Sequence, residues 1–424
     1  MVTKTLFVFA TLALLATNTV FCFPTTPDEA SVKHYNGYRV VRATPETQSQ
    51  FESLLELANQ DKYDFWQDPR PGGFADVMVS PSDYAPVVEF LEAAGVKHSI
   101  MIEDLEPLLF AERQAMRNKP KQDGMNWENY HTWEEVNEWL SSLVAANNSL
   151  ITSEKYGTSF EGRDLFVYKV STGGSDKPAF WIDATIHARE WITTGVITYV
   201  MNELINNSTN YSELLSNIDF YFAPYVNPDG HVYTHLTDRM WRRTRSTENS
   251  TSCRGVDANR NFGFQFGGAG SSGTPCSETY RGKVAYSEPE TLAVKDYILA
   301  KSDVRWEAFI TLHSYSQLWM TPYGYTAEAP EDYADLKRVA DQATSALYSH
   351  FNTSYTVGNA GDVLYLSSGS SRDWAKGEGG FKWVYTIELR DTGRYGFLLP
   401  PDQILDSAIE TWSGIQVVAR ELIR

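Results

Sequence analysis

Two side chains suited to metal binding, His187 and Glu190, stand three residues apart where a predicted strand leads into a predicted helix. The apolar residues 180–183 predict a buried strand, and the apolar segment 192–204 predicts a helix. Both side chains can then point into one site at the carboxyl end of the strand, where open α/β sheets bind their ligands. A catalytic zinc ion commonly has three protein ligands and one water. We expect His313, which follows the strand-like residues 306–312, to be the third ligand.

A His-x-x-Glu pair alone also fits an ordinary surface turn, so the metal site depends on support from other residues. Hydrolysis with zinc needs a general base beside the bound water. Glu388 lies near the end of the strand-like residues 382–389, and its carboxylate can project into the same cleft as the metal. The alternative role for Glu388 is a structural salt bridge with Arg390.

Residues 236–283 predict a long loop rich in Arg, Gly and Ser, and a loop of that length in a compact domain is usually functional. Four arginines and a following Asn-Arg pair stand out in it: Arg239, Arg242, Arg243, Arg245, Asn259 and Arg260. A guanidinium binds a carboxylate through two parallel hydrogen bonds, and a separate arginine can hold an oxyanion. The loop therefore fits recognition of a terminal carboxylate, and the alternative is a solvated basic patch.

The chain has 424 residues, a hydrophobic fraction of 42% and a formal net charge of −18. The negative charge excludes nucleic acid and anionic membranes as expected partners. Residues 1–23 have the basic start and short apolar core of a secretory signal, and they are too short to span a bilayer. We therefore expect a secreted, extracellular protein.

Of the three cysteines, Cys22 lies at the edge of the signal, which leaves Cys253 and Cys276 as an expected disulfide. A zinc role for these two cysteines is the alternative, although they have no partner ligands nearby in sequence. Acceptor sequences for N-linked glycans fit the secretory route and occur at Asn147, Asn206, Asn207, Asn210, Asn249 and Asn352.

Residues 35–102 predict a small unit with the order βαββαβ, an antiparallel sheet with helices on one face. Its second helix, at residues 82–94, has Ser82 as the expected cap. A charged helix at residues 103–117 leads into a polar, basic segment with Pro and Gly, which is the best domain boundary. A trypsin-like protease would find exposed targets there, namely Arg113, Arg117, Lys119 and Lys121.

The second unit begins near residue 126 and alternates strands with helices, which predicts a largely parallel sheet covered on both faces. Its first helix, at residues 132–146, starts with a capping box of Thr132 and Glu135. Further helices are expected at residues 192–204, 288–301, 333–351 and 404–424, and strands at residues 165–170, 180–184, 218–224, 306–312 and 382–389. The sequence Asn227-Pro-Asp-Gly predicts a turn after the third of these strands.

The second unit resembles the zinc metallocarboxypeptidases of the pancreatic carboxypeptidase A/B family, and the first unit resembles their inhibitory propeptide. The matching segments keep the order and spacing of that family: His187-Ala-Arg-Glu-Trp, Val226-Asn-Pro-Asp-Gly, Trp241-Arg-Arg-Thr-Arg, Gly255-Val-Asp-Ala-Asn-Arg-Asn, Cys276-Ser-Glu-Thr-Tyr, His313-Ser-Tyr-Ser-Gln and Glu388-Leu-Arg-Asp-Thr-Gly-Arg-Tyr-Gly-Phe. The resemblance implies a signal peptide at residues 1–23, an activation propeptide with its linker helix at 24–121, and a catalytic domain at 122–424. It also implies a mixed, mostly parallel twisted sheet with helices on both faces, preceded by a small α+β antiparallel open-sandwich propeptide.

The resemblance assigns a role to each candidate residue. It implies one Zn²⁺ per chain on His187, Glu190 and His313, with Glu388 activating the water and Arg242 stabilising the oxyanion. The implied substrate-binding residues are Arg189, Arg239, Asn259, Arg260, Ser314, Tyr315, Tyr365 and Arg372. Tyr365 belongs to a loop at residues 364–369 that is expected to form a mobile cap. The resemblance also pairs Cys253 with Cys276.

Arg372 departs from the best-known family members, which carry an aliphatic residue (A-type) or an aspartate (B-type) at the floor of the specificity pocket. An arginine there predicts a preference for C-terminal Glu, then Asp, as in the members selective for C-terminal glutamate. The alternative is an A-type pocket in which Arg372 turns away and pairs with Asp373 or another internal acid. Gly324, Ser367 and Ser370 are small and would leave room for a medium-length side chain.

The implied partners are peptides with a free C-terminus, the chain's own propeptide as inhibitor and a trypsin-like activating protease. No nucleic acid or membrane partner is expected, and the protein is expected to be a monomer. A second hypothesis is a non-catalytic carboxypeptidase-like binding protein, which the complete set of ligand and base residues disfavours.

Overall fold

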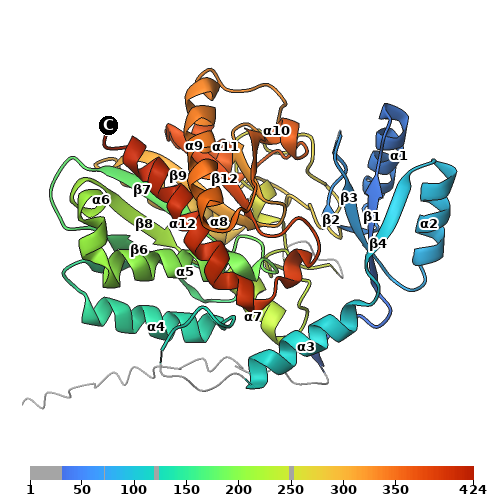
Figure 1. Ribbon diagram of the computed structural model, residues 1–424, viewed down its shortest axis with the longest axis horizontal. Helices are drawn as coiled ribbons and strands as arrows, with labels where there is room; N and C mark the ends of the chain where they lie inside the picture. The colour runs from blue at the N-terminus through green and yellow to red at the C-terminus, as the bar shows by residue number, and fades with distance from the viewer. Residues whose placement is uncertain (1–30, 71, 119–123, 248–252) are drawn as a thin grey trace, which may run out of the picture.

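A computed structural model describes residues 31–70, 72–118, 124–247 and 253–424. The expected signal peptide, Lys119, Lys121 and the glycan acceptor Asn249 lie outside the described residues. Figure 1 shows two lobes side by side, a small one in blue and cyan and a large one in green to red. We call them the pro-unit (residues 31–118) and the catalytic unit (residues 124–424).

The pro-unit is a four-stranded antiparallel sheet in the order β2-β3-β1-β4, which confirms the predicted βαββαβ arrangement. Its elements are β1 (Arg39–Thr44), α1 (Gln48–Ala58), β2 (Asp64–Gln67), β3 (Ala75–Val79), α2 (Tyr84–Ala93), β4 (Lys97–Ile102) and the linker helix α3 (Leu105–Asn118). Alternate residues of the strands face opposite ways. Val41 and Val77 pack against α1 and α2, whereas Val40 and Met78 pack against the catalytic unit. The sheet is therefore buried on both faces, by its own helices and by the second lobe.

Of the two helix caps predicted from the sequence, one is present and one is not. Thr132 and Glu135 form the predicted capping box at the start of α4 (Trp133–Ala146). The prediction that Ser82 caps the second helix is wrong, because α2 begins after Asp83 and has no side-chain cap. Asp83 is the cap residue, and the Ser80 carbonyl oxygen in the preceding turn accepts hydrogen bonds from the Asp83 and Tyr84 amides at 3.1 and 3.0 Å.

The catalytic unit is built on an eight-stranded mixed sheet in the order β11-β10-β12-β9-β7-β8-β6-β5. Its strands are β5 (Ile151–Thr158), β6 (Asp164–Val170), β7 (Pro178–Asp183), β8 (Asp219–Ala223), β9 (Arg305–Ser314), β10 (Leu318–Thr321), β11 (Thr356–Asn359) and β12 (Trp383–Leu389). The four central strands β12, β9, β7 and β8 are parallel, and antiparallel pairs flank them. The carboxyl ends of these four strands consequently meet at one edge of the sheet.

Helices cover both faces of this sheet, as the alternation of strands and helices predicted. The remaining helices are α5 (Trp191–Asn206), α6 (Ser212–Asn217), α7 (Pro228–Leu236), α8 (Pro289–Ala300), α9 (Tyr333–Phe351), α10 (Ala360–Val363), α11 (Ser371–Gly377) and α12 (Ile404–Glu421). In β7, Phe180 and Ile182 pack with α4, α5, α9 and α12, whereas Ala179 and Trp181 pack with α8 and α11. Figure 1 shows α9, α12 and α5 together on one side of the sheet. Within the described ranges, no helix has the length and apolarity needed to cross a bilayer.

The predicted turn at Asn227-Pro-Asp-Gly is wrong, because these residues begin helix α7. Asn227 is the cap and its side-chain oxygen accepts a hydrogen bond from the Gly230 amide at 2.9 Å. Pro228 occupies the first helical position, where a missing N–H costs nothing. Asn, Pro and Asp favour turns and helix starts alike, so the local sequence did not distinguish between the two.

The long loop is confirmed and is closed by the expected disulfide between Cys253 and Cys276. The alternative zinc role for these cysteines is thereby removed. A short 3-10 turn, Ala258–Arg260, interrupts the loop and is capped by the Asp257 side chain. This turn carries Asn259 and Arg260 to the sheet edge where β9 and β12 end.

Candidate active site

Three predicted metal ligands meet at the carboxyl edge of the sheet. His187 and Glu190 lie in the connection from β7 to α5, and His313 lies near the end of β9. Their ligand atoms all fall within 4.8 Å of one another, and all three residues are buried. His187 Nδ1 lies 2.7 Å from Glu190 Oε1, and His313 Nδ1 lies 3.2 Å from Glu190 Oε2. Two imidazoles and one carboxylate are a common protein ligand set of catalytic zinc, so the residues present fit that ion.

The protonation states of this group suit metal binding. Burial lowers the pKa of His313 to about 4, which keeps the imidazole neutral at physiological pH. Burial opposes ionisation of Glu190, but its close contacts with the His187 and His313 rings hold its pKa well below the ordinary value. A neutral imidazole and an ionised carboxylate are the forms that bind a metal.

Asp257 supports the metal group from behind, a role that the sequence analysis did not assign. Its Oδ1 lies 3.2 Å from His187 Nε2, the ring nitrogen that points away from the other ligands. Its Oδ2 accepts a hydrogen bond from Arg242 Nη2 at 2.8 Å. Burial raises the pKa of Asp257, but Arg242, Arg260 and His187 outweigh that effect and hold it well below the ordinary value. A carboxylate in this position fixes the ring orientation of a metal-binding histidine.

Glu388 is placed beside the metal group by strand pairing. It is the register partner of His313 in the parallel pair of β12 and β9. Burial and the neighbouring Glu190 carboxylate raise the pKa of Glu388 well above its ordinary value, although Arg242 opposes the shift. The alternative salt bridge to Arg390 does not form, because Arg390 Nε donates to Glu410 Oε1 at 2.7 Å. Glu388 is therefore positioned to exchange a proton with a group held at the metal.

The candidates for binding a terminal carboxylate lie next to His313. Asn259 Nδ2 lies 3.4 Å from His313 Nε2, and Asn259 Oδ1 accepts a hydrogen bond from the Ser371 amide at 2.9 Å. The Arg260 guanidinium lies 5.9 Å from the centre of the Tyr365 ring. Burial is the largest of the effects that raise the pKa of Tyr365 to about 12, so its hydroxyl stays protonated and can donate a hydrogen bond.

Arg372 is buried at the start of α11, and its guanidinium has three different neighbours. Nε donates to Asp373 Oδ1 at 3.0 Å, so the ion pair considered as an alternative is present. Nη1 and Nη2 lie 3.3 Å from the hydroxyl oxygens of Thr386 and Ser367. A Cβ added at Gly324 would meet Nη2 at 1.8 Å, so the arginine lies directly over this glycine.

Ser370 serves the helix rather than the pocket, because its hydroxyl caps α11 by accepting from the Asp373 amide. The Asp373 carboxylate also accepts hydrogen bonds from the Gly324 and Tyr325 amides at 2.9 Å. Its negative charge is consequently shared between Arg372 and two backbone donors. Asp373 thus binds only the Nε atom of Arg372. The Nη1 and Nη2 atoms make only weak hydrogen bonds to hydroxyl groups.

The pro-unit contacts the remaining predicted substrate-binding residues. Arg189 pairs with Asp64, and Arg239 pairs with Glu112. The Tyr315 hydroxyl donates to Asp76 at 2.7 Å. The sequence did not single out these pro-unit acids, because nothing distinguishes them from the many other acidic residues of the first unit. Only the docking of the two lobes brings them to the arginines and to Tyr315. Ser314 makes no such pro-unit contact: its amide donates to Glu190 Oε2 at 3.2 Å, and its buried hydroxyl has no hydrogen-bond partner among the described residues.

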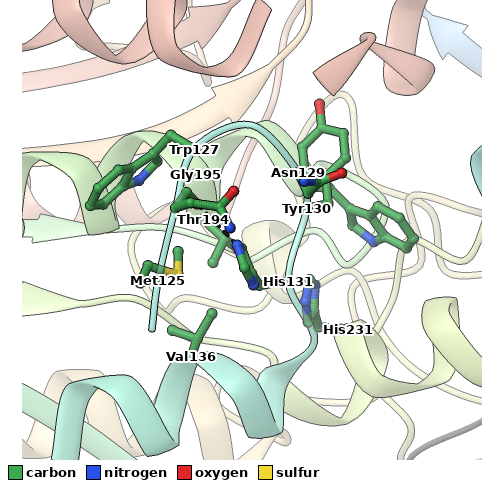
Figure 2. A pocket seen from close by; sticks show the side chains of 11 residues that line it. Met125, Trp127, Asn129, Tyr130, His131, Val136, Thr194, Gly195 and His231 are labelled. Carbon is green, nitrogen blue, oxygen red and sulfur yellow. Dashed lines mark hydrogen bonds between the residues drawn. The ribbon is translucent and has the colours of Figure 1, made fainter. Parts of the chain in front are cut away.

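Trp191, which follows Glu190, anchors the start of α5. Its indole N–H donates to Thr234 at 2.8 Å, its ring stacks on His235 at 4.0 Å, and the Arg239 guanidinium lies 3.7 Å above it. Trp191 is one of the residues that line a pocket, and Figure 2 shows His131, Thr194 and His231 among the others. Burial lowers the pKa of His231 to about 3, so this histidine is neutral. His187, Glu190 and His313 are not among the residues that line this pocket.

A metal-dependent hydrolase is the class of protein that this fold and site define, because a zinc-type ligand group and a carboxylate base share one edge of an α/β sheet. Residues 136–414 match the family described as zinc carboxypeptidase, and residues 41–112 match the carboxypeptidase activation peptide. The chain therefore belongs to the zinc carboxypeptidase family and carries an activation peptide. It is a metallocarboxypeptidase made as a zymogen, and zinc is its metal.

Three relatives illustrate the likeness. Carboxypeptidase A2 of Rattus norvegicus is 44% identical over 391 residues, which cover 90% of this chain and 93% of the relative. Carboxypeptidase B of Astacus astacus is 47% identical over 296 residues, 70% of this chain and 97% of the relative. The crystal structure of the carboxypeptidase A of Helicoverpa armigera superposes with a TM-score of 0.86 at 31% identity, covering 92% of this chain and 98% of that one. The similarity thus extends to both A-named and B-named enzymes.

Proposed function

We propose that this zinc exopeptidase prefers peptides that end in glutamate and, less strongly, in aspartate. The observation that carries the proposal is the Nη1–Nη2 edge of Arg372, which faces the hydroxyls of Thr386 and Ser367 at 3.3 Å. Two long contacts to neutral hydroxyls satisfy a buried guanidinium poorly. A carboxylate that binds both nitrogens in parallel offsets much more of its desolvation.

The Asp373 pair is the main argument for the alternative, an A-type enzyme for aliphatic or aromatic ends. A full neutralisation of Arg372 would leave the pocket without net charge. However, Asp373 reaches only Nε, and its oxygens also accept two backbone N–H groups. The Nη edge therefore keeps its donors available, and the acidic preference is the better supported of the two.

The proposed chemistry assigns one task to each group around the metal. His187, Glu190 and His313 would hold the zinc ion, which would supply an activated water and a Lewis acid for the scissile carbonyl. Glu388 would accept a proton from the attacking water and deliver it to the leaving amine of the released amino acid. Arg242 holds the oxyanion that forms on the scissile carbonyl oxygen, because its guanidinium is fixed by Asp257 beside Glu190.

Binding of the C-terminal residue completes the scheme. Asn259 and Arg260 hold its carboxylate, and the Tyr365 hydroxyl closes over it as a donor. Arg189, Arg239, Ser314 and Tyr315 contact the preceding residues. The hypothesis of a non-catalytic binding protein is disfavoured, because the chain belongs to the zinc carboxypeptidase family.

We also propose that the chain is secreted after loss of residues 1–23, and that residues 24–121 are removed as the propeptide. The catalytic domain is then residues 122–424. A trypsin-like cut after a basic residue between Arg113 and Lys121 separates the two units, and the product is a monomer. The disulfide and the exposed glycan acceptor Asn206 support the secretory route.

Two peptides that differ only in a C-terminal Glu or Gln test the proposal, because the two side chains have almost the same shape. We expect kcat/KM for Glu to exceed that for Gln by about tenfold or more, since only Glu pairs with Arg372. Equal values for the two peptides would refute the role of Arg372. An Arg372→Gln variant should bring the two values together.

A further inference from the structure

Two arginines of the cleft are neutralised by the pro-unit. Arg189 Nη1 lies 2.7 Å from Asp64 Oδ2, and Arg239 Nε lies 2.6 Å from Glu112 Oε2. Arg239 Nη2 also donates to Glu112 Oε1 at 3.2 Å. The arginine side chains are 1% and 5% exposed in this state. Both are thus buried cations whose only ion-pair partners among the described residues belong to the pro-unit.

Among the described residues, no hydrogen bond or ion pair joins either arginine to Arg372 or to the rest of α11. Arg239 Nη1 donates to the Arg189 carbonyl at 2.9 Å, and Nη2 donates to the Phe397 carbonyl at 2.8 Å. The site proposed for the terminal residue is instead tied to α11 through Asn259. A substrate whose last residue lies at Arg372 can extend its preceding residues past the metal group toward Arg189 and Arg239.

The pro-unit itself places a peptide segment, residues 64–68, along this path. Asp64 meets Arg189, and the Trp66 ring packs against the Phe397 and Tyr315 rings at 5.0 and 6.5 Å. Gln67 Nε2 donates to the Tyr315 carbonyl at 3.0 Å. Asp68 follows, and Arg260 and Arg242 are the cations that act most strongly on it. An extended segment with an acid at each end thus occupies the cleft.

Removal of the pro-unit takes Asp64 and Glu112 away and leaves two cations without anions. The catalytic unit offers few anions that could replace Asp64 and Glu112. Glu278 is its carboxylate that acts on Arg189. Glu278 lies 3.8 Å from Arg243, and among the described residues it forms no ion pair with Arg189 or Arg239. A guanidinium in a partly desolvated cleft favours a carboxylate partner.

We infer that Arg189 and Arg239 select acidic side chains in the residues that precede the C-terminal one. The substrates of the activated enzyme are then peptides with a stretch of acidic residues at the C-terminus, and the pro-unit inhibits by presenting the same charges. This inference rests on the proposed exopeptidase function, but it does not require that the last residue be Glu.

The test measures peptide binding to the activated, zinc-loaded Glu388→Gln protein, so that it does not depend on turnover. The peptides share one C-terminal residue and carry either Glu or Gln at the second, third or fourth position from the end. We expect Glu to lower Kd by about 2- to 5-fold at one or more of these positions, the range of one partly screened ion pair. The advantage should shrink as salt rises from about 0.05 to 0.5 M. Equal Kd values at all three positions would overturn the inference.

Variants locate the effect. Arg239→Gln and Arg189→Gln, each added to Glu388→Gln, should reduce the advantage of Glu, while Arg189→Lys should keep part of it. Arg305→Gln is the matched control, because Arg305 starts β9 at the opposite end from His313 and pairs with Glu307. If the arginine variants do not fold, the salt dependence of the Glu-to-Gln difference in Kd, measured on the Glu388→Gln protein alone, still tests the inference. Failure of the unmutated enzyme to cleave these peptides would contradict the proposed function and would leave the Kd comparison valid.

Discussion

Glu388 and His313 face each other across neighbouring parallel strands, as register partners of β12 and β9. Strand pairing therefore fixes the distance between the proposed base and a metal ligand more firmly than a loop would. The pairing of β12 with β9 is the structural link between these two residues. A change at Glu388 should consequently affect the chemistry and leave the metal in place.

Replacement of Glu388 by Gln tests this separation. The activated Glu388→Gln enzyme should hold about one zinc per chain, because His187, Glu190 and His313 are unchanged. Hydrolysis should fall by about 10²- to 10⁴-fold or more, the contribution of a general base. Metal content and kcat/KM are measured on the same sample, with the exposed Glu378→Gln as the control. Hydrolysis that survives in Glu388→Gln would refute the assignment of the base.

The acids of the pro-unit should control activity before cleavage. An Asp64→Asn, Glu112→Gln double variant loses both ion pairs to the cleft arginines. If each pair contributes about 1 kcal/mol, the uncleaved chain should become about 30-fold more active on a small peptide. Asp83→Asn is the control, because Asp83 pairs with Lys62 inside the pro-unit.

Treatment with trypsin should bring the parent, the double variant and the control to the same activity. An uncleaved parent that is already as active as the cleaved enzyme would contradict autoinhibition by the pro-unit. An unchanged activity of the uncleaved double variant would show that the two ion pairs do not hold the lobes together.

Glu290, at the start of α8, predicts a pH dependence of stability. Its side chain is fully buried, Oε1 accepts a hydrogen bond from the Phe160 amide, and Oε2 has no hydrogen-bond partner. Burial and the Glu288 carboxylate raise the pKa of Glu290 to about 8. An unfolded glutamate has a pKa near about 4.3, so the native state holds an extra proton between that pH and about 8.

The free energy of unfolding should therefore fall as pH rises through this window, by at most about 1.4 kcal/mol per pH unit from this group. Glu290→Gln cannot ionise, so the variant should gain stability over the parent from about pH 5.5 to 8. Thermal unfolding of the zinc-loaded zymogen at several pH values measures this difference. A difference that stays constant with pH, as expected for the exposed control Glu213→Gln, would refute the buried ionisation.

The sequence predicted the metal group well because local rules determine it. A buried strand, a turn and a helix bring His187 and Glu190 together, and parallel pairing of strands brings in His313. The strand β5 was not predicted, since it is an edge strand with exposed polar residues such as Glu154 and Lys155. Edge strands lack the apolar pattern that marks buried ones.

Contacts between distant parts of the chain were beyond sequence reasoning. The support of His187 by Asp257 depends on the path of a long loop, although the carboxylate lies only two residues before Asn259. The pairing of Arg189 with Asp64 depends on the docking of two lobes. The orientation of Arg372 depends on Asp373, Thr386 and Ser367 together, and only the ion pair to Asp373 was considered from the sequence.

The specificity pocket is tested most directly by kcat/KM of the activated enzyme on peptides that differ only in a C-terminal Glu, Phe, Leu or Lys. Our account predicts that Glu leads, because only Glu brings an anion to the Nη atoms of Arg372. In an Arg372→Asp variant the preference should move toward Lys, and Arg372→Gln should remove the advantage of Glu if the aspartate variant fails to fold. An unmutated enzyme that prefers Phe or Leu would contradict this account of the pocket.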